Sequence, residues 1–360
     1  MTLRIHVIRT FWPHWGKFSG INQFIRYIDA NQFEIHEYLT SSTDEDFPLK
    51  NPAIRNILRS CIQKQNMDWY QLNDLMAEIR AFFTCILMRV DIIHYLDGEH
   101  ATQFLPYVFW SPIRRTKLVA MYHQPLDLLK KVTNKNIIRR LDAVIVVSPE
   151  QIPYFTEIIE PEKIHLILHG IDTTFYKPGN QSKDGGKFKC ITVGHWLRDF
   201  KVVRAVAERL SRYNNIEFHI VSSSKVGPEE FDLEDLKNVI LHKDTVDDEG
   251  LRELYQQSHL LFLPLIQSTA NNTLLEGLSC GLPIVSTLLP SIEAYVSKEG
   301  TILIEKNDPD RFADTILYLY DNPSERQKMG IASRKRAEEL DWRRIAPLYE
   351  AVYNQVINSS

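Results

Sequence analysis

The chain has 360 residues, of which 44% are hydrophobic and 24% are charged. It is too long for one typical domain, and its composition is that of an ordinary soluble globular protein with a core of normal density. The net charge is −4. A general nucleic-acid binder should be strongly basic, so we expect no nucleic acid among its partners.

The four cysteines are widely scattered, with no CxxC pair and no Cys/His spacing typical of zinc. We therefore expect reduced thiols in a cytosolic compartment and no metal site. The N-terminus starts with a polar-flanked strand, and no apolar stretch approaches the roughly 18 residues that a membrane span needs. These features predict a cytoplasmic protein without a secretory signal or a transmembrane helix.

Short apolar runs alternate with helical segments along the chain. Many runs are continuous, as in parallel strands that are buried on both faces. They are Leu3–Thr10, Glu34–Thr40, Asp91–Leu96, Lys117–His123, Ala143–Ser148, Ile164–His169, Phe188–Val193, Ile216–Ser222, Val239–His242, Leu260–Leu265, Pro283–Thr287 and Thr301–Glu305. This alternation predicts βαβ units and doubly wound sheets.

A polar segment with proline and glycine, residues 177–186, separates two series of strands and is the best linker candidate. We predict an α/β protein with two Rossmann-like domains that face a cleft, and ligands bound beyond the carboxyl ends of the strands. The first domain is 1–176 with the C-terminal helix 342–360, and the second is 177–341. The final helix has an apolar stripe that must be buried, and packing on the first domain is one solution.

A glycine-rich loop follows the first strand. It runs from Gly16 to Gly20 and includes Lys17. Glycine lets a backbone approach a phosphate closely, although a plain strand-to-helix turn would look the same.

Two further motifs lie at strand ends in the first half. Asp97, Glu99 and His100 form an acidic and histidine cluster that suggests contact with an acceptor or a sugar, without a convincing metal partner. His123 ends a predicted buried strand, so it would lie at the edge of the cleft. A lone histidine is more often structural, and that interpretation stays open.

Residues 128–141 form a basic amphipathic stretch. Its Lys and Arg side chains could meet anionic lipid headgroups, which would make the protein peripheral at the inner membrane face. The alternative is a solvated helix face, which is preferred unless the acceptor is linked to lipid.

The strongest local pattern is 268–287, which predicts a polar loop, a short helix, a Gly-Leu-Pro turn and a strand. Unpaired N–H groups and the helix dipole would bind a diphosphate at the start of this helix. Those N–H groups belong to Asn271, Asn272, Thr273 and Leu274. Glu276 lies one turn into the helix, where a carboxylate can accept two hydrogen bonds from a ribose diol. Alternatively, Asn271 or Asn272 caps a structural helix and Glu276 is a solvated acid.

This segment resembles the donor-site signature of retaining family 4 glycosyltransferases. In that signature a Glu and, after seven residues, a second Glu precede a small helix that ends in Gly-x-Pro and two Val or Ile residues. Glu276 matches the second Glu, which implies binding of the ribose hydroxyls. Ser268 stands where the first Glu contacts the transferred sugar, so the resemblance names no sugar.

Residues 193–201 resemble the Gly-Arg…Lys segment that opens the second domain of the family. The resemblance implies that Lys201 neutralises the donor diphosphate and that Gly194 and His195 line the donor site. His195 stands where an Arg is usual, and Arg198 would supply the missing cation.

Other positions agree in chain order. Thr245 and Val246 match the place where the family holds the base through main-chain contacts. The loop that ends at Gly20 is similar to the family's glycine-rich loop, which approaches the donor phosphates or the acceptor. His123 is similar to the active-site histidine near the transferred sugar, and residues 169–178 resemble the domain junction.

The resemblance spans nearly the whole chain. It implies a GT-B fold and a retaining, metal-independent glycosyltransferase with no cofactor. Such an enzyme moves a sugar from a nucleoside-diphosphate sugar to a hydroxyl acceptor, which could be a glycan, a lipid or a small molecule. A non-catalytic nucleotide-sugar or glycan-binding protein and a GT-B sugar epimerase remain as alternatives, because fold alone does not settle function.

Overall fold

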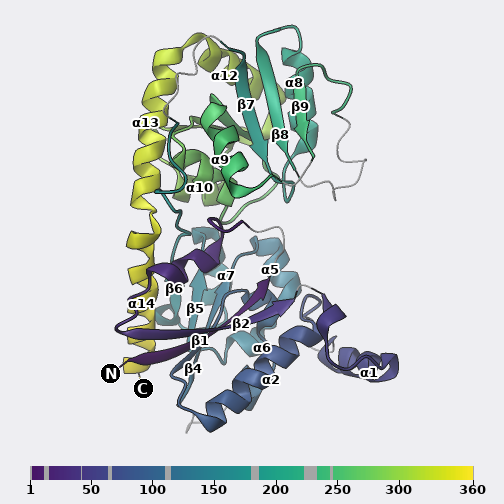
Figure 1. The fold of residues 1–360 in the computed structure, drawn as a ribbon, viewed down its shortest axis with the longest axis vertical. Helices are drawn as coiled ribbons and strands as arrows, with labels where there is room; N and C mark the ends of the chain where they lie inside the picture. Colours follow the sequence, from purple (N-terminus) through teal and green to yellow (C-terminus); the bar gives the residue numbers. More distant parts are fainter. Residues whose placement is uncertain are drawn as a thin grey trace. The chain divides into compact units, whose positions relative to one another are not determined.

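The computed structural model describes most of the chain: residues 2–11, 16–41, 43–63, 67–109, 115–179, 186–222, 233–243 and 246–359. These residues divide into two compact units. Unit 1 contains the residues up to 11, residues 21–169 and the residues from 342 onward. Unit 2 contains residues 16–20 and 170–341. Figure 1 shows a central sheet with flanking helices in each unit.

Unit 1 is built on a parallel sheet with the strand order β2-β1-β3-β4-β5-β6. Its strands are β1 (Leu3–Phe11), β2 (Phe33–Ser41), β3 (Ile92–Tyr95), β4 (Lys117–Tyr122), β5 (Ala143–Val146) and β6 (Ile164–Leu166). Its longer helices are α1 (Pro52–Gln63), α2 (Leu72–Leu87) and α14 (Trp342–Asn358). Its shorter helices include η1 (Ile21–Tyr27), α3 (Gly98–Ala101), α4 (Leu105–Val108), α5 (Leu126–Val132), α6 (Lys135–Ile138) and α7 (Ile152–Thr156).

Unit 2 repeats the architecture with a parallel sheet in the order β12-β11-β10-β7-β8-β9. Its strands are β7 (Phe188–Val193), β8 (Ile216–Val221), β9 (Val239–His242), β10 (Leu260–Leu263), β11 (Ile284–Thr287) and β12 (Thr301–Ile304). Its helices include α8 (Phe200–Leu210), α9 (Asp248–Gln257), α10 (Asn272–Ser279), α11 (Pro290–Tyr295), α12 (Pro309–Asp321) and α13 (Pro323–Glu339).

The predicted α/β fold with two parallel sheets is confirmed. Every predicted apolar run overlaps a strand, and all residues of β3, β5 and β10 are buried. Continuous burial of this kind arises because helices cover both faces of a parallel sheet. In unit 1 one apolar core joins α2, α5, α6 and α7 to the sheet.

The C-terminal helix α14 packs within unit 1. Tyr349 stacks on Phe24 of η1 with ring centroids 4.4 Å apart. The Tyr353 hydroxyl lies 2.7 Å from Nδ1 of His94 in β3. The predicted stripe is thus buried on the first sheet and η1, apart from Leu348, which is 46% exposed.

The basic stretch 128–141 forms two short helices instead of one. Thr133 ends α5 with an extended backbone, and its hydroxyl donates to the Leu129 carbonyl. Asn134 then caps α6 by accepting the N–H of Asn136. None of the helices in the described part of the chain is both long and apolar enough to span a bilayer.

Candidate functional site

The first turn of α10 in unit 2 is held by a side-chain cap. The Asn271 side-chain oxygen accepts the N–H of Leu274 at 3.2 Å. This is the capping role that sequence reasoning allowed as an alternative. The N–H groups of Asn272 and Thr273 in the same turn have no partner within a helix and point along its positive end.

Glu276 lies inside unit 2 and is 4% exposed. Its Oε1 accepts a hydrogen bond from the Ser19 hydroxyl at 2.6 Å, and its Oε2 accepts one from the Tyr255 hydroxyl at 2.8 Å. Burial raises the pKa of the Glu276 carboxyl, and the two hydroxyl donors partly oppose this shift. The alternative interpretation of Glu276 as a solvated acid is wrong, because α9 and the loop at residues 16–20 cover it.

The Arg198 side chain also lies at the start of α10. Its Nη2 donates to the Thr273 hydroxyl at 3.2 Å and to the Asn271 side-chain oxygen at 3.4 Å. Its Nε donates to the Val193 carbonyl at the end of β7. Burial lowers the pKa of Arg198 to about 10, so the guanidinium is still charged at neutral pH.

A cation at the positive end of a helix is electrostatically unfavourable unless an anion joins it. The backbone between β7 and α8 is shaped to hold Arg198 there. Gly194 has φ +80°, and a Cβ on Gly194 would lie 3.4 Å from Nη2 of Arg198. Leu197 also has a positive φ of 58°. Arg198 and the start of α10 therefore place a guanidinium and unpaired helix N–H groups side by side, which makes this the candidate anion site.

The remaining predicted donor residues differ in exposure. Lys201 is exposed in the first turn of α8, and His195 is exposed after β7. Ser268 is buried, and its hydroxyl donates to the Thr269 carbonyl at 3.4 Å. Val246 is half-buried just before α9, whereas Thr245 lies outside the described residues.

The glycine-rich loop packs against α9 of unit 2. The N–H of Lys17 donates to Oδ2 of Asp248 at 2.6 Å. A Cβ on Gly16 would lie 1.9 Å from Oδ1 of the same carboxylate, so a larger residue there would displace the Asp248 side chain. Gly20 has φ +96°, which again favours glycine. Phe18 stacks on Phe175 with ring centroids 3.8 Å apart.

In unit 1, polar side chains gather at the carboxyl ends of β1, β3 and β4. Oδ2 of Asp97 accepts the N–H of Thr10 at 3.0 Å. Oε1 of Glu99 accepts the N–H of His123 at 3.0 Å and lies 3.9 Å from its ring Nδ1. The His123 ring is 5.2 Å from that of His169, measured between centroids.

Burial dominates the electrostatics of this second group. It raises the pKa of Glu99 to about 8, with a further contribution from Asp97, and raises that of Asp97 to about 6. It lowers the pKa of His123 well below the usual value. His100 has a pKa lowered to about 4 by burial and stacks on Trp69, so its ring is used in packing.

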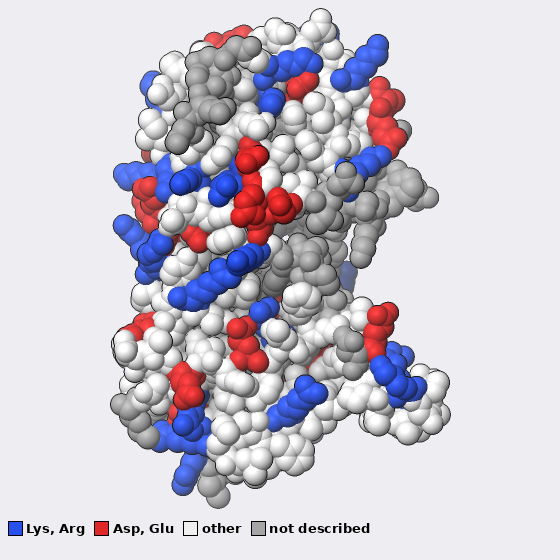
Figure 2. All heavy atoms as spheres, in the orientation of Figure 1, with Lys and Arg blue, Asp and Glu red and all other residues white. Residues whose placement is uncertain are grey.

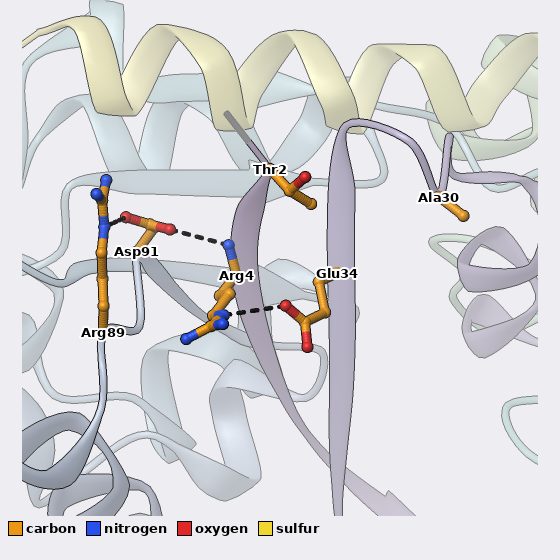
Figure 3. Close-up of a pocket in the computed structure, with 6 residues that line it drawn as sticks. All are labelled: Thr2, Arg4, Ala30, Glu34, Arg89 and Asp91. Atoms are coloured by element: carbon orange, nitrogen blue, oxygen red, sulfur yellow. Dashed lines mark hydrogen bonds and ion pairs between the residues drawn. The ribbon is translucent and has the colours of Figure 1, made fainter.

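A pocket at the opposite end of the first sheet is shown in Figure 3. Arg4 pairs with Glu34 at 3.0 Å, and Asp91 accepts both the Nε of Arg89 at 2.7 Å and the N–H of Arg4 at 2.9 Å. The pocket lies at the amino ends of β1, β2 and β3. Ligands of open α/β sheets bind at the carboxyl ends, so this pocket is not the candidate site.

Sequence reasoning missed Tyr255, Ser19 and Asp248. Ser19 lies within the glycine-rich loop but had no predicted role of its own, whereas Tyr255 and Asp248 belong to no recognisable local motif. All three reach the candidate site only through tertiary packing. Tyr255 is the buried residue of an amphipathic helix and looks like an ordinary core aromatic.

Comparison with known proteins finds glycosyltransferase families along both halves of the chain. Residues 190–322 match the family described as glycosyl transferases group 1, and residues 19–175 match glycosyltransferase family 4. A D-inositol 3-phosphate glycosyltransferase of Corynebacterium diphtheriae is 24% identical over 79% of this chain and 75% of its own length. An MMP alpha-(1->4)-mannosyltransferase of Mycolicibacterium hassiacum is 22% identical over 55% of this chain and 50% of its own.

Solved structures share the fold over nearly the full length. Sucrose-phosphate synthase from Thermosynechococcus elongatus superposes with a TM-score of 0.73 at 16% identity, covering 99% of this chain and 100% of that one. Anabaena HepE in complex with UDP superposes with a TM-score of 0.65 at 12% identity, covering 99% of each chain.

Proposed function

Because the chain belongs to the GT-B glycosyltransferases of the family 4 type, we propose that it transfers a sugar from a nucleoside-diphosphate sugar to a hydroxyl acceptor, with retention of anomeric configuration and without a metal. The observation that carries this proposal is the Arg198 guanidinium at the positive end of α10, in the same unit as the buried Glu276. A diphosphate matches the first feature, and a ribose diol matches the second.

In this proposal the leaving diphosphate is stabilised by charge that is already in place. Arg198 and the N–H groups of Asn272 and Thr273 meet the phosphates, and Lys201 closes over them from the first turn of α8. Glu276 holds the ribose, with its carboxylate oriented by Tyr255. No additional cofactor is required.

The acceptor and sugar side is assigned to unit 1. His123 lies near the transferred sugar, and Glu99 fixes its backbone. At neutral pH the Glu99 carboxyl carries a proton, since burial raises its pKa to about 8, so it can donate a hydrogen bond to a sugar or acceptor oxygen. Ser268 leaves the sugar without the carboxylate that the family uses.

The protein would act in the cytoplasm, with peripheral membrane contact through residues 128–141 where the acceptor is linked to lipid. The Lys and Arg side chains of this stretch would meet anionic headgroups.

The test is a panel of UDP-, GDP- and ADP-sugars in which binding and nucleotide release are measured with and without acceptor fractions. We expect one nucleotide to bind, and its release to need an acceptor and to persist in EDTA. Lys201→Ala should lower the release rate at least tenfold, whereas Lys298→Ala, an exposed lysine of the same unit, should not. NMR of the product anomer tests retention.

Each outcome is decisive. Binding without release for any acceptor would assign the protein to the non-catalytic nucleotide-sugar binders. Absence of binding to every donor would refute the whole donor site.

A further inference from the structure

The C-terminal end of α2 exposes large apolar side chains. Phe83 is 57% exposed, Ile86 62%, Leu87 82% and Met88 50%. The opposite face of the helix is buried through Ala77 and Ala81, so these four side chains are not needed for the core. Figure 2 shows a white, uncharged area where α2 ends. Apolar clusters at a surface usually mark an interaction site.

The apolar surface continues onto α4. The ring of Phe82 lies 5.6 Å from that of Phe83 and 5.7 Å from that of Phe109, between centroids. Just before Phe109, Tyr107 is 36% exposed and Val108 is 40% exposed. We call the exposed apolar residues of this surface the α2–α4 strip. It consists of Phe83, Ile86, Leu87, Met88, Tyr107 and Val108.

One basic side chain contacts the strip directly, and others lie on the same segments of the chain. The Arg140 guanidinium lies over the Tyr107 ring, 4.5 Å from its centroid, and joins the strip to the basic stretch 128–141. The segments 79–89, 104–109 and 128–141 contain no Asp or Glu, although the whole chain has a net charge of −4. The exposed cations on these segments include Arg80, Lys130, Lys131 and Arg139.

The positive charge and the apolar surface together indicate which kind of partner binds here. A second copy docked through the same surface would bring the cations of both copies together. Anionic phosphates, by contrast, match the cations, and the acyl boundary of a bilayer matches the strip. Lys and Arg side chains can keep their charge at headgroup level while their stems contact apolar surface.

We propose that the α2–α4 strip inserts into the headgroup region of an anionic lipid bilayer while Arg140 and the exposed cations of residues 79–89 and 128–141 bind lipid phosphates. This surface extends the contact proposed above for residues 128–141 and gives it an apolar anchor on α2. It does not depend on the chemistry of the donor site.

The test is co-sedimentation of the full chain with phosphatidylcholine vesicles that contain or lack a minor fraction of phosphatidylglycerol. We expect binding only to the anionic vesicles, and weaker binding as salt is raised. Ile86→Glu with Leu87→Glu should reduce the bound fraction at least tenfold, and Lys130→Glu with Lys131→Glu should reduce it severalfold. Ile331→Glu, which alters a 65% exposed isoleucine of unit 2, is the matched control.

Nucleotide binding and the thermal unfolding midpoint should stay unchanged in the strip variant, which separates a lost membrane contact from a misfolded or donor-deficient protein. The proposal is overturned if the wild type does not bind anionic vesicles or if the strip variant binds them equally well. It is also overturned if sedimentation velocity shows wild-type self-association that the strip variant abolishes, since the strip would then bind a second copy.

Discussion

Glu276 in unit 2 and Glu99 in unit 1 are both buried glutamates with a raised pKa, yet their surroundings differ. Glu276 accepts hydrogen bonds from two hydroxyl groups, and Arg198 binds at the start of its helix. Burial and the nearby Asp97 raise the pKa of Glu99, which hydrogen bonds from backbone N–H groups, including that of His123, and from the Gln124 side chain only partly oppose. The first setting suits a ribose and a diphosphate. The second favours the protonated carboxyl and suits a neutral hydroxyl group. Burial alone therefore does not define what a glutamate does; its partners do.

The largest expected effect comes from removing the carboxylate of Glu276. Glu276→Ala should weaken binding of the preferred nucleoside diphosphate by about 100-fold, because a hydrogen bond to a charged group contributes roughly 1.5–3 kcal/mol and about 1.4 kcal/mol is tenfold in affinity. Isothermal titration calorimetry measures this loss of affinity. Glu299→Ala, at an exposed glutamate of the same unit, should leave the affinity unchanged. Equal affinities for the two variants would remove Glu276 from the site.

The second prediction tests the role of the Arg198 guanidinium independently of that of the Glu276 carboxylate. Arg198→Gln should weaken binding of the nucleoside diphosphate by about tenfold and binding of the nucleoside alone by far less, because the guanidinium serves the phosphates. Arg209→Gln, at an exposed arginine of α8, is the control. If nucleoside and nucleoside diphosphate lose affinity equally, Arg198 acts by supporting the fold of the loop and not by binding phosphate.

The third prediction concerns the orientation of Glu276. Tyr255→Phe removes the hydroxyl donor to Oε2, which should raise the pKa of Glu276 further and lower the nucleotide affinity severalfold. Since a higher pKa leaves less of the ionised carboxylate in acid, the loss should be larger at pH 6 than at pH 8. Affinity measured across this range tests the sign, with Tyr318→Phe, at a half-exposed tyrosine, as the control. A pH-independent loss would mean that Tyr255 acts by packing alone.

Much of the fold could be predicted because many of its strands, such as β3 and β5, are continuous apolar runs. Such a run by itself indicates a strand that is buried on both faces. The cap at Asn271 was also within reach, since an Asn before a helix is a local signal. The burial of Glu276, by contrast, could not be predicted from the sequence. It depends on Tyr255 and Ser19, which lie 21 and 257 residues away in the sequence. Contacts over such separations leave no periodic pattern in the sequence, so a glutamate one turn into a short helix looks solvated until the packing is known.

The smallest expected effect on activity, and the clearest on stability, is at Glu99. Its pKa in the folded protein, about 8, lies above the value of about 4.3 for an exposed glutamate. The folded state therefore holds a proton that the unfolded state has lost between these two values. The contribution of Glu99 to stability is complete below the unfolded pKa and declines as pH rises towards the folded one.

Glu99→Gln cannot ionise, so it should abolish this decline. We expect the free energy of unfolding of the wild type, relative to Glu99→Gln, to fall between pH 5 and pH 8 in urea titrations. Comparing the two proteins cancels the contributions of the buried histidines, provided that Glu162→Gln, at an exposed glutamate of unit 1, follows the wild type. If the difference is constant over this range, Glu99 is ionised in the folded protein. The two buried glutamates would then differ only in their partners, which for Glu276 are the two hydroxyl donors and the nearby Arg198, and not in their protonation state.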